Sequence, residues 1–209
     1  MAERIYTFDD VTPASAQWPF VEALVRNGIA GGCAAAPPLF CPGANVTRGQ
    51  MAKFLCIAAG RTPLDNATPT FADVPKTYWG YGYVERLADA ASWGGAPPTG
   101  GCRMVGTAKY FCPFDPVTRE QMAKFLCLAA GKPPMSSCSG AFADIWRGGW
   151  ACPYIERLAD AASWGGTAVT SGCACPSMMP GGSKCYCPAS NTARGEMAVF
   201  LVRAFGITL

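Results

Sequence analysis

Apolar residues recur along the chain with the spacing of amphipathic helices, and one such pattern occurs three times. In its first copy, Met51, Phe54, Leu55 and Ala58 follow the i, i+3, i+4, i+7 spacing that lines one face of a helix. The other copies are Met122, Phe125, Leu126, Ala129 and Met197, Phe200, Leu201, Ala204. A glycine follows each copy, as is common after a helix C-terminus. We therefore predict three equivalent helices.

A second helical pattern precedes each of these helices, and a tryptophan precedes each copy of that pattern. The apolar positions are Val21, Leu24, Val25; Val84, Leu87, Ala88, Ala91; and Ile155, Leu158, Ala159, Ala162. The tryptophans are Trp18, Trp79 and Trp150. Because large aromatic side chains dominate small cores, we expect all three to be buried rather than to contact a sugar.

Long identities show that the chain is an internal repeat. Glu85–Gly95 recurs unchanged at Glu156–Gly166, and Gln50–Cys56 recurs at Gln121–Cys127. The repeated units run over 8–60, 71–131 and 142–206, and the proline-containing linkers 63–69 and 132–139 place domain boundaries at 1–62, 63–133 and 134–209. One helix–loop–helix hairpin cannot bury its apolar face alone. We therefore predict a mainly α fold, in which three helix–loop–helix repeats form a pseudo-threefold six-helix bundle with protruding loops.

Charge and composition exclude several classes of protein. The net charge is only +3, with acidic and basic residues interspersed, and the longest apolar stretches are short and interrupted, as by Lys124. We therefore expect neither nucleic-acid binding nor membrane insertion. The chain has no histidine, no glycine-rich phosphate loop and no pair of carboxylates outside the repeat. We expect a protein that is not an enzyme and has no cofactor or metal.

Twelve cysteines indicate disulfides in an oxidising compartment, and hence export. The first six residues contain no apolar signal core, so either a leader was removed or the chain is part of something larger. In the first two units a pair of cysteines brackets the same loop, and in the third unit one cysteine pair lies inside another. These positions predict disulfides. The predicted pairs are Cys33–Cys41, Cys102–Cys112, Cys138–Cys152, Cys173–Cys187 and Cys175–Cys185.

Two alternatives concern the remaining chemistry of the cysteines. The four nested cysteines of the third unit match a four-thiolate zinc site less well than a hairpin with two bridges, because C-x-C spacing is unusual for zinc. Cys56 and Cys127 occupy equivalent positions on two second helices. They are either bridged across the bundle or buried as small hydrophobic side chains.

The order of short motifs within each unit resembles the S-layer homology family. Phe-x-Asp-Val, an apolar helix, a glycine-rich loop and Phe-x-Pro lead to a Thr-Arg-x-Glu/Gln segment at the start of a second helix. The two best copies of that segment are Thr47–Gln50 and Thr118–Gln121, whereas the third has Ala193 before Arg194. The resemblance covers nearly the whole chain as three tandem modules.

The resemblance implies a function and a location. Triplets of such modules bind cell-wall-linked polysaccharide, often bearing an acidic pyruvyl ketal, in grooves between modules, and so anchor bacterial proteins at the cell surface. It thus implies a non-catalytic anchoring module outside the cell, whose partner is a cell-wall polysaccharide or peptidoglycan-linked glycan. The candidate residues for an anionic glycan are Arg48, Arg119, Arg194, Thr47, Thr118, Trp93 and Trp164.

The Thr-Arg segment can also be explained by a structural role that needs no ligand. Thr47 and Gln50 have the spacing of a capping box, as do their counterparts at 118 and 121. The arginine is unexpected there, because a cation opposes the positive end of the helix dipole, so we expect it to have an anionic partner. That partner is either an aspartate of the repeat (Asp10, Asp73 or Asp144) or a ligand carboxylate beside free helix N–H groups.

The third unit differs, and the chain also fits a structural role. Where Ala193 replaces threonine, we expect the cap to come from Thr192, Asn191 or water, and we expect the first two units to bind most of any glycan. Trp93 and Trp164 lie in an inserted Ser-Trp-Gly-Gly segment and are expected to be exposed. A disulfide-clamped bundle with such loops also suits a self-assembling subunit of a surface layer, filament or appendage, and hence a homo-oligomer.

Overall fold

The computed structural model describes residues 7–170, 172–177, 179 and 181–209, and this part of the chain is mainly α. Two short antiparallel hairpins accompany the helices in the first two units. The helices are α1 (Trp18–Arg26), α2 (Arg48–Ala58), α3 (Tyr81–Ala88), α4 (Arg119–Ala129), α5 (Cys152–Ala159) and α6 (Arg194–Phe205). The strands are β1 (Ala34–Ala35), β2 (Pro38–Leu39), β3 (Arg103–Val105) and β4 (Ala108–Tyr110).

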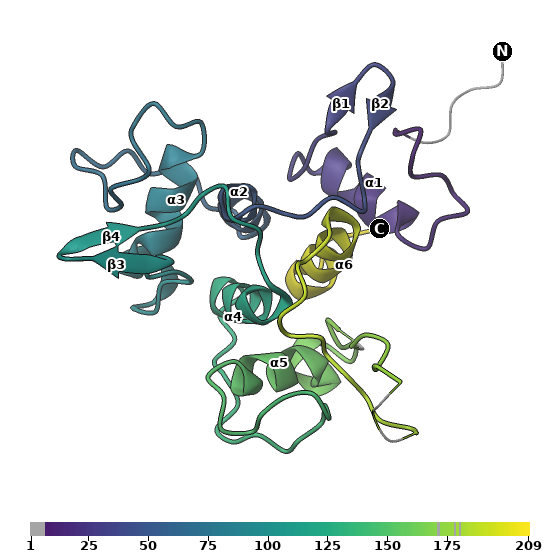
Figure 1. Ribbon diagram of the computed structural model, residues 1–209. Helices are drawn as coiled ribbons and strands as arrows, with labels where there is room; N and C mark the ends of the chain where they lie inside the picture. The colour runs from purple at the N-terminus through teal and green to yellow at the C-terminus, as the bar shows by residue number, and fades with distance from the viewer. Residues whose placement is uncertain (1–6, 171, 178, 180) are drawn as a thin grey trace, which may run out of the picture.

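The second helices of the three units lie together at the centre of the molecule. α2, α4 and α6 contact one another, and the remaining helices and hairpins surround them (Figure 1). Met51, Phe54 and Leu55 are buried, as the apolar pattern predicts, but Ala52 and Cys56 are buried as well. The central helices are therefore covered on more than one face, because each has neighbours on several sides.

The main helix pairs form between units rather than within them. α2 packs against α3, α4 against α5, and α6 against α1 (Figure 1). Each second helix thus covers the first helix of the next unit, and the pair α6–α1 joins the two ends of the chain. The expected hairpin of two helices packed within one unit is wrong. The loop between those helices is long enough to carry the second helix to the neighbouring unit.

Three main-chain hydrogen bonds connect the units in a closed ring at the start of the central helices. Val46 N–H donates to the carbonyl of Thr192 at 2.9 Å, Thr192 N–H to Val117 at 2.8 Å, and Val117 N–H to Val46 at 2.9 Å. All three residues are fully buried. Each bond links a different pair of units, so no unit can leave without breaking two of them.

The first helices are shorter than their apolar pattern predicts. α3 ends at Ala88 because Asp89 leaves the helical conformation and caps a separate 3₁₀ helix, Ala90–Trp93, by accepting a hydrogen bond from Ala91 N–H at 3.3 Å. A second 3₁₀ helix, Ala161–Trp164, follows α5, where Asp160 likewise leaves the helical conformation but its side chain makes no cap hydrogen bond. Ala91 and Ala162 therefore do not lie on the first helices, contrary to the prediction.

The two linkers are fixed to the helices that follow them. Within the first, Leu64 N–H donates to Gly82 of α3 at 2.9 Å, and just before it the carbonyl of Thr62 accepts from Arg86 at 2.8 Å. In the second, Met135 N–H donates to Pro153 of α5 at 3.1 Å. The two proline-containing segments are therefore held against α3 and α5 by hydrogen bonds.

Five disulfides close the loops, and they are the five pairs that the positions predict. They are Cys33–Cys41, Cys102–Cys112, Cys138–Cys152, Cys173–Cys187 and Cys175–Cys185. With its four sulfurs joined in pairs, the nested set in the third unit has no thiolates to offer zinc. Cys56 and Cys127 are separate, buried thiols rather than a bridge across the bundle.

Candidate functional site

The first N–H groups of each central helix are bonded to the next unit rather than left open. At α2, Arg48 N–H donates to the carbonyl of Asp115 and Gly49 N–H to that of Pro113, both at 2.9 Å. The equivalent donors of α4 bond to Ser190 and Pro188, and those of α6 bond to Ala44 and Pro42. The expectation of free helix N–H groups beside a ligand carboxylate is therefore wrong at these positions.

The arginine side chain at each helix start connects the same two units. Its Nε donates to the main-chain carbonyl of an aromatic residue in the next unit, and its guanidinium lies over that residue's ring. The pairs are Arg48 with Phe111 (2.6 Å), Arg119 with Tyr186 (2.8 Å) and Arg194 with Phe40 (2.8 Å). All three arginines are buried. They form a cyclic set of ties, from unit one to two, two to three, and three to one.

The repeated aspartate holds the same aromatic segment from its other side. The carboxylate of Asp73 accepts the N–H groups of Phe111 and Cys112, both at 2.7 Å. Asp10 and Asp144 make the equivalent bonds. Among the described residues none of these aspartates forms an ion pair with the arginine, so the expected Arg–Asp pair is wrong. The aspartate instead stabilises a strained cysteine, since Cys112 has a φ of 57°.

The capping predictions are confirmed for two of the three helices. Thr47 Oγ1 accepts from Gln50 N–H at 3.3 Å while the Gln50 side chain accepts from Thr47 N–H at 3.2 Å, and Thr118 with Gln121 does the same. Both threonine hydroxyls thus serve the helix cap. In the third unit Thr192 provides no cap, because its buried hydroxyl has no hydrogen-bond partner in the described part of the chain. There the Ala193 N–H donates to Glu196 Oε2 at 3.1 Å.

Trp18 is partly buried against the core, in keeping with the prediction, but the other four tryptophans to which the prediction refers are placed in the opposite way. Trp93 and Trp164 are half-buried against the core, and their Nε1 groups donate to the carbonyls of Arg86 and Arg157. Trp79 and Trp150 are instead 56% and 53% exposed. Each lies two residues before its helix, α3 or α5, whereas Trp18 begins α1, so the three are not equivalent positions. When the three units are aligned on their buried apolar positions, the offset of Trp18 from the other two tryptophans is visible in the sequence.

A cavity of about 410 Å³ opens beside Arg48 of the first unit, and it is lined mainly by the second unit and by one residue of the third. Its lining includes the side chains of Gln121, Lys124 and Phe125 of α4, the loop 98–102, and Trp150. Arg48 is only 4% exposed, and its Nη2 is buried without a hydrogen-bond partner among the residues that the structure describes. Burial lowers the pKa of Arg48, an effect that the charge of Asp115, also in the lining, partly opposes.

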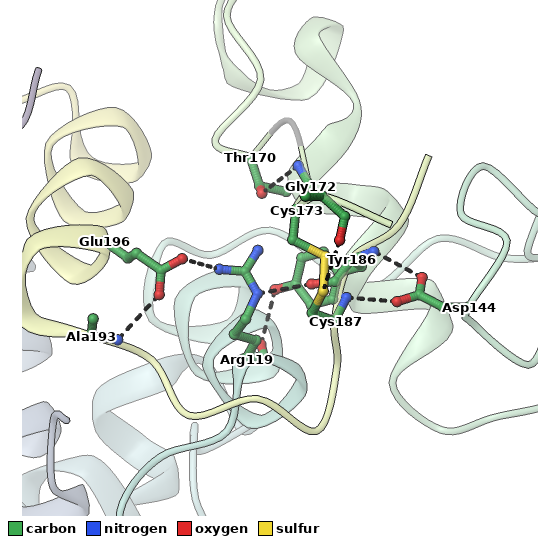
Figure 2. A network of polar contacts seen from close by, with 10 residues as sticks. Arg119, Asp144, Thr170, Gly172, Cys173, Tyr186, Cys187, Ala193 and Glu196 are labelled. Carbon is green, nitrogen blue, oxygen red and sulfur yellow. Dashed lines mark hydrogen bonds and ion pairs between the residues drawn. A yellow bond between two sulfur atoms is a disulfide. The ribbon is translucent and has the colours of Figure 1, made fainter. Parts of the chain in front are cut away.

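The cavity beside Arg119 is smaller, about 150 Å³, and a protein carboxylate already lies in it. Glu196 Oε1 accepts a hydrogen bond from Arg119 Nη1 at 2.7 Å and forms an ion pair with it. Figure 2 shows Glu196 reaching Arg119 from one side while Tyr186 approaches from the other. At the third tie, Arg194 donates through Nε and Nη2 to the carbonyls of Phe40 and Gly31.

Comparison with known families supports the resemblance in one part of the chain. Residues 7–52 match the model of the S-layer homology domain. The matched segment runs from the entry of unit one to the first turns of α2, and so includes Arg48 and its cap. A comparison with curated proteins gave no match. Within the described residues, none of the helices combines the length and apolar character needed to cross a bilayer.

Proposed function

We propose that the chain is a non-catalytic anchoring module of the bacterial cell envelope that binds an acidic cell-wall polysaccharide. Residues 7–52, in the first unit, match the model of a family whose members are generally cell-wall anchors. We extend it to three modules, at 1–62, 63–133 and 134–209, because the arginine tie, the aspartate bonds and the αL cysteine recur in each unit. An anchor of this kind acts at the cell surface, where the five disulfides are stable.

The buried, incompletely bonded guanidinium of Arg48 is the observation that supports the proposal best. A charged group taken out of water is costly unless it is paired and hydrogen-bonded. In the described part of the chain Arg48 has one side-chain hydrogen bond, to Phe111, and no ion pair. A ligand carboxylate entering the cavity would supply the missing acceptor, and guanidinium–carboxylate hydrogen bonds are among the strong ones.

The remaining lining of the Arg48 cavity fits a sugar. Lys124 adds a second cation, and Gln121 and Thr99 offer polar groups for hydroxyls. Trp150, half exposed, provides an aromatic face on which the apolar side of a sugar ring can pack. Asp115 also lines the cavity, so the balance of charged side chains is two cations to one carboxylate, which favours an anionic ligand.

Co-sedimentation with purified cell-wall sacculi tests the proposal. Because Arg48 also ties two units together, we use Trp150→Ala and Lys124→Ala, which remove lining side chains without removing that tie. The matched control is Trp146→Ala, since this tryptophan is 78% exposed and belongs to the same unit but is not part of the Arg48 lining. We expect the wild type and the control to sediment with sacculi and both lining variants to be retained less. Equal retention of all four proteins would show that this cavity is not the binding site.

A second candidate function is self-assembly into a surface layer or filament. It is favoured by the hairpin β3–β4, where Met104 and Val105 are more than half exposed. Exposed apolar tips of this kind suit contacts with a second copy. Light scattering of the purified chain separates the two functions, because an anchor stays monomeric at concentrations where a self-assembling subunit forms larger species.

A further inference from the structure

The cavities beside Arg48 and Arg119 are equivalent in the repeat but differ at a position that faces the arginine. Two residues after the first residue of the neighbouring central helix, α4 has Gln121 and α6 has Glu196. Gln121 lines the Arg48 cavity as a neutral side chain. Glu196 lines the Arg119 cavity and is bonded to the guanidinium at 2.7 Å (Figure 2).

We propose that Glu196 is an internal anion that occupies the Arg119 cavity, so that an external acidic ligand is directed to the Arg48 cavity. This inference rests on the proposed function and names the residue that decides which groove binds. An internal carboxylate loses no translational freedom on pairing, because it is already held beside its partner by the chain. An external carboxylate must therefore displace it before reaching Arg119.

The two cavities also differ at other lining positions. Lys124 lines the Arg48 cavity, whereas Val199 stands at its counterpart in α6 and lines the Arg119 cavity. Trp150 lines the first cavity, whereas Gln17, from the segment just before α1, lines the second. The lining of the Arg119 cavity thus contains neither a lysine nor a tryptophan among the described residues, its second cation is Arg203, and its volume is less than half as large.

Arg203 is the remaining charged side chain in the lining of the Arg119 cavity. Its Nη1 donates to the carbonyl of Val169 at 3.5 Å, and its guanidinium lies 5.6 Å from the centre of the Phe20 ring. It therefore packs against α1 and the loop of unit three, whereas Glu196 is bonded to Arg119 itself. Removing the negative charge of Glu196 leaves two cations in the cavity, a charge that favours an acidic ligand.

The structural role of Glu196 does not need its charge. Its Oε2 accepts the Ala193 N–H, and in the other two units a glutamine oxygen accepts the equivalent N–H of Thr47 or Thr118. Glu196→Gln therefore keeps the cap and removes the internal anion. Gln121→Glu is the reciprocal change, which places a carboxylate at the same position beside Arg48.

The test is a titration of the full chain with a 4,6-O-pyruvylated hexosamine, followed by NMR at the Nε–H signals of Arg48 and Arg119. The same hexosamine without the ketal is the control ligand. In the wild type we expect the pyruvylated sugar to shift the Arg48 signal and not the Arg119 signal. In Glu196→Gln we expect both signals to shift, and in Gln121→Glu we expect affinity at Arg48 to fall by about tenfold, the effect of roughly one charge-assisted hydrogen bond.

The outcomes separate this inference from the proposed function. If Arg48 responds in the wild type but Arg119 remains silent in Glu196→Gln, Glu196 does not close the second cavity and this inference alone fails. A response of Arg119 in the wild type also overturns it. If neither arginine responds in any variant, the proposed function fails, and the inference fails with it. Native-like spectra of both variants are expected, because a glutamine and a glutamate oxygen each accept the capping N–H in this protein, and they show that any change is local.

Discussion

Arg48 donates its Nε–H to the main-chain carbonyl of Phe111, 63 residues later in the chain, at 2.6 Å. The same contact is made by Arg119 to Tyr186 and by Arg194 back to Phe40. The arginine at the start of each second helix thus connects two units by a hydrogen bond, and at Arg48 and Arg119 it also places a positive charge beside a cavity. Among the described residues the Nη2 groups of Arg48 and Arg119 are both buried without a partner, but only Arg48 adjoins a large cavity and has no internal carboxylate partner.

We predict that Asp73→Asn destabilises the protein by about 2 kcal/mol, because a charged acceptor of two buried N–H groups is replaced by an amide whose NH₂ cannot accept. The measurement is the free energy of unfolding from urea denaturation. Asp65→Asn is the control, since Asp65 is largely exposed and paired only with Lys76, and we expect a change within about 0.5 kcal/mol. Equal effects of the two substitutions would contradict the role given to Asp73.

Trp93 and Trp146 should differ in their contribution to stability. Trp93→Ala removes a half-buried ring and its hydrogen bond to Arg86, and we expect a loss of about 2 kcal/mol in the free energy of unfolding. Trp146→Ala removes a ring that is mostly exposed, and we expect a change within about 0.5 kcal/mol. Thermal or urea unfolding of the two variants measures the difference. If Trp146→Ala proves the more destabilising, the assignment of Trp93 to the core is wrong.

Cys56 and Cys127 should be unreactive until the protein unfolds. Both side chains are fully buried, and burial raises the pKa of each thiol to about 12, so almost no thiolate is present at neutral pH. We expect a thiol reagent to modify neither residue in the native protein and both in denaturant without reductant. Mass mapping after labelling gives the result. Fast labelling of the native chain, or the absence of both thiols in denaturant, would contradict this assignment.

The carboxylate of Glu156 should make stability depend on pH. Burial acts to raise its pKa, but hydrogen bonds from the N–H groups of Ser139, Gly140 and Ala141 outweigh burial and hold the pKa below its ordinary value of 4.5. A group with a lowered pKa in the folded state contributes stability above its unfolded pKa and loses it as the pH falls. The stability difference between wild type and Glu156→Gln should therefore shrink between pH 6 and pH 3, taking these as rough limits around that value. A difference that stays constant would exclude this effect.

Local features of the fold were predictable from the sequence, because their signals are local. The cap of α2 follows from a threonine and a glutamine three residues apart, and the loop disulfides follow from equivalent cysteine positions. The aspartate bonds and the arginine ties could not be predicted. Their partners are main-chain groups of a distant segment, and a main-chain carbonyl such as that of Phe111 leaves no residue-type signal in a sequence.

The placement of the tryptophans failed for a different reason. Residue type alone suggests that Trp18 is equivalent to Trp79 and Trp150, but the buried positions Val21, Val84 and Ile155 show that it corresponds to Tyr81 and Cys152. The helical period, applied from the buried residues, would have placed Trp79 and Trp150 before their helices. The difference between Gln121 and Glu196 was visible in the sequence, but its meaning depends on which arginine each side chain faces.

Calorimetric titration with the pyruvylated hexosamine tests the central claim, that the Arg48 cavity binds an acidic sugar, most directly. We predict saturable binding to the wild type, no measurable binding of the hexosamine without the ketal, and affinity about tenfold lower for Trp150→Ala, in keeping with the value of one stacked aromatic contact. Trp146→Ala should bind as the wild type does. Equal binding of the two sugars, or full affinity in Trp150→Ala, would contradict the claim.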